Sequence, residues 1–101
     1  KVGTYQIAIA AKYHNVPVWV TGAPDPGHPT IDTITIEQRD PEFVLQAMGV
    51  RTAAKGVKGY YPSFDITPPE LVTGVVTDFG VYKPTELSKY FEENPNPGFM
   101  V

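Results

Sequence analysis

The fold of this chain depends most on one stretch, 61-YPSFDITPPELVTGVVTDFG-80. Its middle carries the sequence signals of a helix start. Thr67 is placed to be the N-cap, Pro68 suits the first helical position, where no N–H is needed, and Glu70 follows the cap by three residues, as in a capping box. Gly80 is a residue type that commonly ends helices. The stretch therefore predicts a helix over residues 68–79.

The residues just before this helix, 60–64, read as a short extended segment. A carboxylate, Asp65, stands between this segment and the helix start. In an open α/β sheet, ligands bind where strands end and helices begin. Asp65 is therefore a candidate binding residue, and the alternative is that it only braces the turn.

The rest of the chain alternates expected helices with expected strands. The expected elements are a helix over 3–14 that Asn15 ends, a strand over 16–20, a loop over 21–30, a strand over 33–36, a short helix capped by Asp40 and ended by Gly49, a strand over 57–61, the helix over 68–79, an edge strand at 81–82 and a last helix capped by Thr85. In the short helix, Phe43, Val44 and Ala47 are expected to point inward. This alternation predicts an α/β fold with a mostly parallel sheet flanked by helices, in which strands 16–20 and 57–61 are neighbours or nearly so.

Composition excludes several classes of function. With 101 residues the chain is one small domain at most, and its net charge of −3 gives no electrostatic case for binding nucleic acid. There is no cysteine, the two histidines stand apart, and no apolar run approaches the roughly 20 residues of a membrane span. No metal site and no membrane anchor are therefore expected. Gly3 lacks the Gly-x-Gly-x-x-Gly spacing of a dinucleotide site, so NAD and FAD are not expected either. Because the chain starts on Lys1, directly before a helix, an N-terminal part is expected to be missing.

Several motifs resemble one superfamily, which comprises methylthioribose-1-phosphate isomerases, ribose-1,5-bisphosphate isomerases and the regulatory subunits of translation initiation factor 2B. They follow the family's order from residue 1 to about residue 87: KVGTYQ at 1–6, IEQRDPE at 36–42, GVRTA at 49–53, and FDITPPELVTG with TDFGV over 64–81. Two features depart from the isomerase pattern. Tyr61 and Pro62 stand where the isomerases usually have Asn-Pro, and the connection from Asp32 to Ile36 lacks a hairpin that they carry.

The resemblance implies the C-terminal, Rossmann-like half of a two-domain protein, with residues 1–93 in a domain that is incomplete at its N-terminal side and 94–101 as a mobile tail. It implies part of an aldose–ketose isomerase that converts 5-methylthioribose 1-phosphate to 5-methylthioribulose 1-phosphate in methionine salvage. Ribose-1,5-bisphosphate isomerase and a non-catalytic regulatory subunit remain alternatives. No cofactor is implied. The implied partners are a sugar-phosphate substrate, the missing N-terminal part and a second copy in a homodimer, in the cytoplasm and, in a eukaryote, also the nucleus.

The resemblance places no catalytic residue in this chain, because the family's catalytic cysteine and aspartate lie upstream of the segment that aligns with Lys1. Lys1 itself aligns with a lysine that contacts substrate in the family, so it is the first candidate for substrate binding and Asp65 is the second. Arg39 and Arg51 are lesser candidates for an anion contact, since a solvated role is favoured in their charged segments. Ser63 has no neighbouring histidine in the sequence that would make it a nucleophile.

Overall fold

A three-stranded sheet, in the order β1–β4–β5, forms the centre of the larger of two units in this chain. The computed structural model describes residues 1–28 and 30–95. Within these ranges, residues 4–34 and 66–95 make up the unit with this sheet, here called the sheet unit. Residues 1–3 and 35–65 make up the second, here called the hairpin unit.

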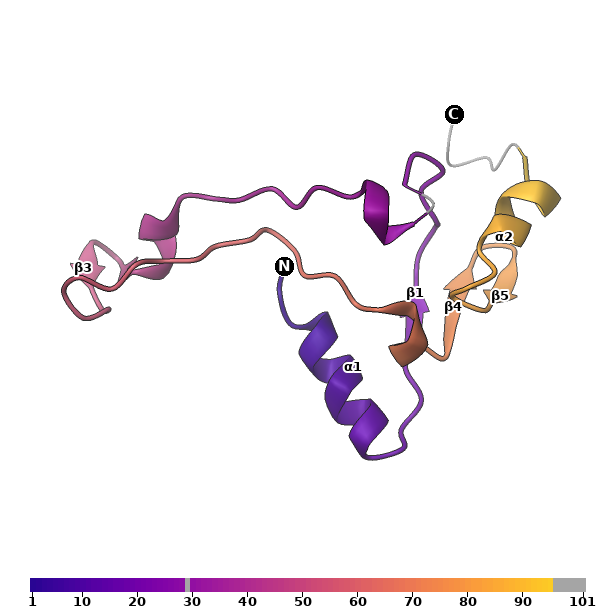
Figure 1. Ribbon diagram of the computed structural model, residues 1–101, viewed down its shortest axis with the longest axis horizontal. Coiled ribbons are helices and arrows are strands. Elements are labelled where there is room, and N and C mark those ends of the chain that lie inside the picture. Colours follow the sequence, from indigo (N-terminus) through magenta and orange to yellow (C-terminus); the bar gives the residue numbers. More distant parts are fainter. Residues whose placement is uncertain (29, 96–101) are drawn as a thin grey trace. The chain divides into compact units, whose positions relative to one another are not determined.

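The sheet is mixed (Figure 1). Strand β1 (Trp19–Thr21) pairs in parallel with β4 (Gly74–Thr77), and β4 pairs antiparallel with β5 (Gly80–Tyr82). The sequence therefore predicted the strand after the first helix, although β1 begins later than residue 16, and it predicted the edge strand at 81–82. The expected parallel neighbour was wrong, because β1 lies beside β4 and not beside residues 57–61.

The expected helix over residues 68–79 does not form. The chain makes one 3-10 turn, η3 (Pro69–Leu71), and then enters strand β4. Pro68 and not Thr67 is the N-cap, without a side-chain capping bond. The helix-start signals act over a single turn only, whereas the run after them is rich in valine and threonine, which favour strands. Gly80 consequently opens β5 after a two-residue hairpin turn, instead of ending a helix.

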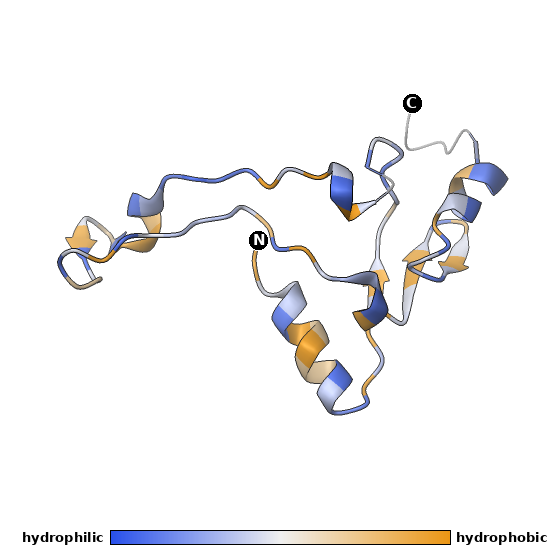
Figure 2. Ribbon diagram, viewed as in Figure 1, coloured by the Kyte–Doolittle hydropathy of each residue, from blue (hydrophilic) through white to orange (hydrophobic). Residues whose placement is uncertain are grey.

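Helix α1 (Thr4–Tyr13) confirms the first expected helix, and Asn15 follows it with a positive φ of 57°. Figure 2 shows the middle of α1 as strongly hydrophobic. Ala8 is fully buried and the helix contacts η3, yet Ile7 and Ile9 are 66% and 48% exposed. A helix that is apolar on several faces is normally buried on several faces. Among the described residues, only the face of α1 that carries Ala8 is covered.

The last helix, α2 (Ser88–Glu93), starts later than expected, with Leu87 as N-cap and without a side-chain capping bond, so Thr85 is not the cap. Tyr90 of α2 is fully buried and its ring meets that of Tyr82 in β5 edge-on, with centroids 5.7 Å apart. These rings hold α2 against the β4–β5 hairpin. At the expected mobile tail, the backbone N–H of Asn94 donates to the carbonyl of Tyr90. Residues 96–101 lie outside the described residues.

The hairpin unit contains η2 (Pro41–Val44) and a short antiparallel hairpin of β2 (Gln46–Ala47) and β3 (Val50–Arg51). Asp40 caps η2 as expected, since its Oδ1 accepts from the N–H of Glu42 at 3.0 Å. The expected inward side chains were wrong. Phe43 is 73% exposed, Val44 and Ala47 are also exposed, and the buried residue in the segment 41–51 is Leu45.

Two extended runs of the hairpin unit lie side by side, residues 37–39 and 61–63 (Figure 1). The N–H of Arg39 donates to the carbonyl of Tyr61 at 2.8 Å, and the N–H of Ser63 donates to the carbonyl of Glu37 at 2.9 Å. Residues 57–61 form no strand of the sheet, against the prediction. Gly59 lies within this run and Pro62 directly follows it. Both weaken strand pairing, because glycine has no side chain to pack and proline has no N–H to donate to a neighbour. The expected strand at 33–36 is also absent, and η1 (Ile31–Thr33) lies at its start.

Candidate functional site

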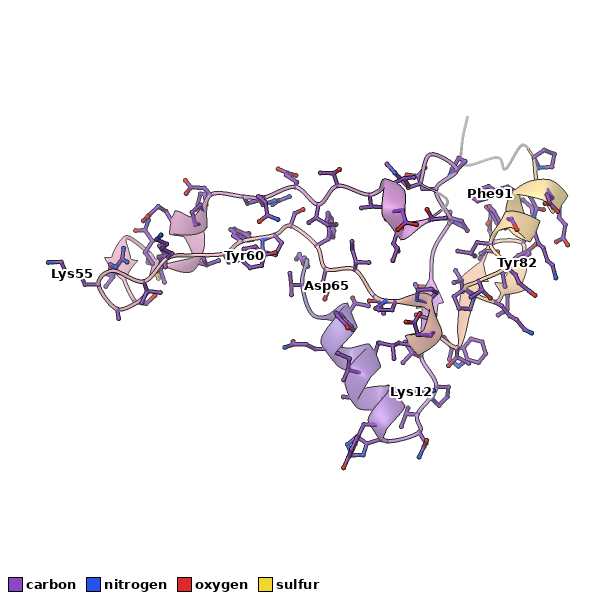
Figure 3. All side chains as sticks on the ribbon, viewed as in Figure 1. Lys12, Lys55, Tyr60, Asp65, Tyr82 and Phe91 are labelled. Carbon is purple, nitrogen blue, oxygen red and sulfur yellow. The ribbon has the colours of Figure 1, made fainter. Side chains whose placement is uncertain are left out.

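The backbone next to Lys1 is fixed by Asp65. Its Oδ2 accepts a hydrogen bond from the N–H of Gly3 at 2.8 Å, and Asp65 is partly buried. Both residues belong to the hairpin unit, in which Figure 3 labels Asp65 on the segment that follows Tyr60. The structure thus connects the two candidate residues of the sequence, Lys1 and Asp65, through the backbone of Gly3.

A hollow of about 640 Å³ lies in the same unit. It is lined by Lys1, Val2, Arg39, Val44 and residues 60–64. The volume is within the range of small-molecule pockets, roughly 300–1,000 Å³. Lys1 therefore lines a hollow large enough for a small ligand. Asp65 is not among the residues that line it, and its printed bond is to the backbone of Gly3, two residues after Lys1.

Arg39 supplies the second positive charge of this hollow. Its side chain is 50% exposed, and its Nη2 lies 4.0 Å from Oε2 of Glu37, which is 70% exposed. An ion pair this long and this exposed to solvent contributes little energy. The guanidinium therefore keeps most of its capacity to donate to an anion. Arg51, the other arginine considered from the sequence, does not line the hollow, and its Nη2 faces the carbonyls of Ala54 and Val57 at 3.4 Å.

Ser63 lines the same hollow and is only 6% exposed. Its Oγ is buried and has no hydrogen-bond partner among the described residues. A buried hydroxyl without a partner costs roughly 1–3 kcal/mol, so native proteins seldom retain one without a reason. The sequence analysis considered Ser63 only as a nucleophile and missed this feature, because burial depends on the pairing of runs 37–39 and 61–63.

The remaining wall of the hollow is aromatic and apolar. Tyr60 and Phe64 are 78% and 57% exposed, and Tyr61 is half-buried. Cations, a hydroxyl and aromatic faces together suit a ligand with an anionic group on an apolar body. Figure 3 labels Tyr60, which projects from the extended run of this unit.

The histidines and acidic residues outside this hollow form no second candidate site among the described residues. Within residues 1–28 and 30–95, no three side chains of His, Asp or Glu gather as metal ligands would. The ring of His28 lies 3.3 Å from the hydroxyl of Thr33 in an exposed loop, and His14 packs edge-on against Tyr13. None of the helices in the described ranges is long and apolar enough to cross a lipid bilayer.

A family profile, curated relatives and solved structures all place this chain in one superfamily. The sequence profile of the Initiation factor 2 subunit family matches residues 1–84. The methylthioribose-1-phosphate isomerase of Trichoplax adhaerens is 43% identical over 89 residues, which are 86% of this chain and 24% of that protein. The isomerase of the same name from Chloroflexus aurantiacus is 43% identical over 95 residues, or 87% of this chain and 26% of that protein. This chain thus spans about a quarter of the length of these curated relatives.

Two solved structures share the fold. The crystal structure of 5-methylthioribose 1-phosphate isomerase from Pyrococcus horikoshii OT3 aligns with a TM-score of 0.76 and 38% identity, over 90% of this chain and 27% of that one. The crystal structure of subunit delta of translation initiation factor eIF-2B from A. fulgidus aligns with a TM-score of 0.72 and 34% identity, over 88% of this chain and 27% of that one. The fold alone therefore does not separate an isomerase from an initiation factor subunit.

Proposed function

Because this chain belongs to the initiation factor 2 subunit family, we propose that the complete protein is an aldose–ketose isomerase that converts 5-methylthioribose 1-phosphate to 5-methylthioribulose 1-phosphate in methionine salvage. The observation that carries this proposal is the 43% identity to relatives named as that isomerase. Among the two solved structures, identity is 38% to the isomerase and 34% to the initiation factor subunit. The IEQRDPE motif at residues 36–42, which resembles the isomerase branch, supports the same choice.

The chemistry of this reaction divides between this chain and the segment before it. The isomerisation moves a hydrogen between C1 and C2 of the sugar, which requires acid–base groups held close to both carbons. The family resemblance implies a catalytic cysteine and a catalytic aspartate upstream of Lys1, and this chain contains no cysteine. Lys1 would hold the substrate through a charge-assisted hydrogen bond, and Asp65 would position Lys1 by holding the backbone of Gly3.

The rest of the protein would complete the fold. We propose that residues 1–93 belong to a Rossmann-like C-terminal domain, and that the sheet of the complete domain continues with parallel strands contributed by the other three quarters of the protein. The exposed isoleucines of α1 support this, because Ile7 and Ile9 need a cover. A homodimer and a cytoplasmic location are part of the same proposal, which draws on the metabolic role of the named relatives.

The test is turnover of the complete protein with two sugar phosphates. 5-Methylthioribose 1-phosphate should be isomerised with a higher kcat/KM than ribose 1,5-bisphosphate. The reverse order would assign the sister isomerase, and no turnover of either sugar, in a folded protein, would assign a regulatory subunit. The 101 residues alone should have no activity, since they contain no thiol.

A further inference from the structure

We propose that residues 99–101, Phe-Met-Val, dock into an apolar groove of the sheet unit and act as a strap across it. The groove is a hollow of about 450 Å³, and all of its lining residues belong to this unit. It shares no lining residue with the hollow that Lys1 lines. The docking is therefore a property of the fold, and it does not depend on which reaction the complete protein catalyses.

The walls of the groove leave aliphatic surface uncovered. They come from the strands β1 and β4, the turns η1 and η3, the first residue of α1 and the segment that leads into α2. Within these walls, Val20, Ile31 and Ile34 are still 36%, 46% and 37% exposed. Aliphatic side chains that line a hollow and remain this exposed gain stability when an apolar group covers them.

The groove and the proposed occupant match in charge. Among the described residues, the groove is lined by none of Asp, Glu, Lys and Arg. Residues 94–101, NPNPGFMV, contain none of these residues either. A charged segment would lose hydration in such a groove without gaining an ionic partner, which is costly. A neutral segment avoids this cost, so the end of this sequence suits the groove better than the charged segments before it.

The groove also offers hydrogen-bond partners to a peptide backbone. Thr30, Thr67 and Thr85 line it, and each threonine hydroxyl can both donate and accept. A peptide enters an apolar groove at low cost only when its N–H and C=O groups find such partners. Hydroxyls among aliphatic walls therefore favour a peptide segment over a purely apolar small molecule.

The segment after α2 has the length and the turn residues to reach the groove. Leu87, directly before α2, lines the groove, and the six residues of α2 span about 9 Å. Phe99 follows Pro95, the last described residue, by four positions, which reach about 13 Å when extended. The sequence NPNPG at residues 94–98 combines Asn-Pro and Pro-Gly pairs, which favour turns. Phe99 can therefore return along α2 as far as Leu87.

Phe99 and Met100 have the side chains that such a groove binds. A phenylalanine ring buries roughly 150–250 Å², and an unbranched methionine fills irregular gaps. Pro95 and Pro97 restrict the free segment before them, which lowers the entropy that docking costs. Phe99 is thus the expected anchor and Met100 the second contact.

Hydrogen exchange in the complete protein tests the docking. Phe99→Ser should speed exchange about tenfold or more at the amides of Thr33 and Ile34, which close the turn η1 in the groove wall. Tyr13→Ser removes a ring from an 82% exposed position of the same unit outside the groove, and should leave these amides unchanged. A freely mobile segment, which the sequence alone predicts for residues 94–101, would give unchanged exchange in Phe99→Ser and overturn the docking.

A synthetic peptide of residues 94–101 distinguishes this occupant from others. The complete protein with both Phe99→Ser and Met100→Ser should bind the peptide and regain slow exchange at Thr33 and Ile34. The wild-type protein should bind it at least about tenfold more weakly, because its own segment competes at high effective concentration. No binding to the double variant would overturn the docking, as expected if the other three quarters of the protein cover the groove. Faster exchange of the wild-type protein on dilution would assign the groove to the segment of a second copy and overturn docking within one chain.

Discussion

Gly3 and Asp65 are joined by a hydrogen bond that spans 62 positions of sequence, from the N–H of one to the Oδ2 of the other at 2.8 Å. The bond ties the backbone that carries Lys1 to the end of the run that lines the hollow. Glycine suits position 3 because its φ of 142° is in a region that other residues rarely adopt. The sequence left open whether Asp65 binds a ligand or braces the turn. In the structure Asp65 braces the backbone, at a position two residues after the candidate binding residue Lys1.

Asp65→Ala should therefore weaken both stability and substrate binding. Loss of a partly buried, charge-assisted hydrogen bond costs about 1.5–3 kcal/mol, and Asp65→Asn, which keeps a carbonyl acceptor, should cost less. Urea unfolding measures the first effect and KM the second. Asp25→Ala is the matched control, because Oδ1 of Asp25 accepts from the N–H of Gly27 at 2.8 Å in an exposed loop. If Asp65→Ala were as mild as this control, the brace would be unimportant.

A second prediction concerns the contact between β1 and β4. A Cβ placed on Gly74 would lie 2.6 Å from Cζ3 of Trp19 and 3.2 Å from Cγ1 of Val81. Gly74→Ala should thus destabilise the sheet unit by about 1–3 kcal/mol, as overpacking usually does. Combined with Trp19→Val, which removes the indole ring, the same substitution should cost much less. A double-mutant cycle on the free energy of unfolding measures this coupling, and additive effects would contradict it.

A third prediction concerns Gly59 in the hairpin unit, which is as closely packed as Gly74 is in the sheet unit. A Cβ on Gly59 would lie 2.7 Å from the carbonyl oxygen of Pro41 and 3.0 Å from Cγ2 of Val44. The carbonyl oxygen of Pro41 belongs to the backbone and cannot move aside easily. Gly59→Ala should therefore disturb the paired runs 37–39 and 61–63, which carry lining residues of the hollow. Hydrogen exchange should show faster exchange at the amides of residues 39 and 63, which pair the two runs. Unchanged exchange there would contradict the prediction.

These contacts explain how much the sequence could predict. Helix α1 was found because its periodicity is local, and β1 because a short β-branched run has few alternatives. The helix over residues 68–79 failed because the capping signals at Thr67 and Glu70 describe one turn. The strand Gly74–Thr77 forms instead because it pairs on both sides, with β5 across a two-residue turn and with β1 more than fifty residues earlier. Long-range pairing of this kind leaves no pattern within a short window.

For the candidate site, too, the sequence identified single residues but not the contacts between distant segments. Lys1 and Asp65 were candidates because a family resemblance and a strand-end argument pointed to them, and Arg39 was noted as a cation. Their connection through Gly3, and the burial of Ser63 without a partner, depend on segments that meet only in the fold. Burial of a serine cannot be read from its neighbours in sequence, since it depends on which run lies opposite.

A fourth prediction concerns high pH and the contact of α2 with the β4–β5 hairpin. The hydrogen bond from Tyr82 to Glu93, at 2.8 Å, raises the pKa of the Tyr82 phenol above its ordinary value of 10.0, and burial adds to the effect. Burial first, and then the hydrogen bond to Asp78, raise the pKa of Tyr90 in the same direction. The folded state therefore retains these protons at pH values where the unfolded chain has released them. The stability that they contribute is complete below pH 10 and is lost as the pH rises through the folded-state pKa values.

Ultraviolet titration of phenolate and a pH series of urea unfolding measure this loss. Tyr82→Phe and Tyr90→Phe should each make the decline above pH 10 shallower, whereas Tyr13→Phe, at an 82% exposed position, should leave it unchanged. If stability fell as steeply above pH 10 in both variants as in the wild-type protein, the loss would belong to other groups.

The last prediction concerns Lys1 in the complete protein. Lys1→Ala removes a cation from the hollow and with it one charge-assisted hydrogen bond to the substrate, worth on the order of 1.5–3 kcal/mol. This loss corresponds to roughly a ten- to hundredfold lower kcat/KM. Lys55→Ala, which removes the same charge in the same unit away from the hollow lining, should have no effect on turnover. Wild-type turnover in Lys1→Ala would remove Lys1 from the site.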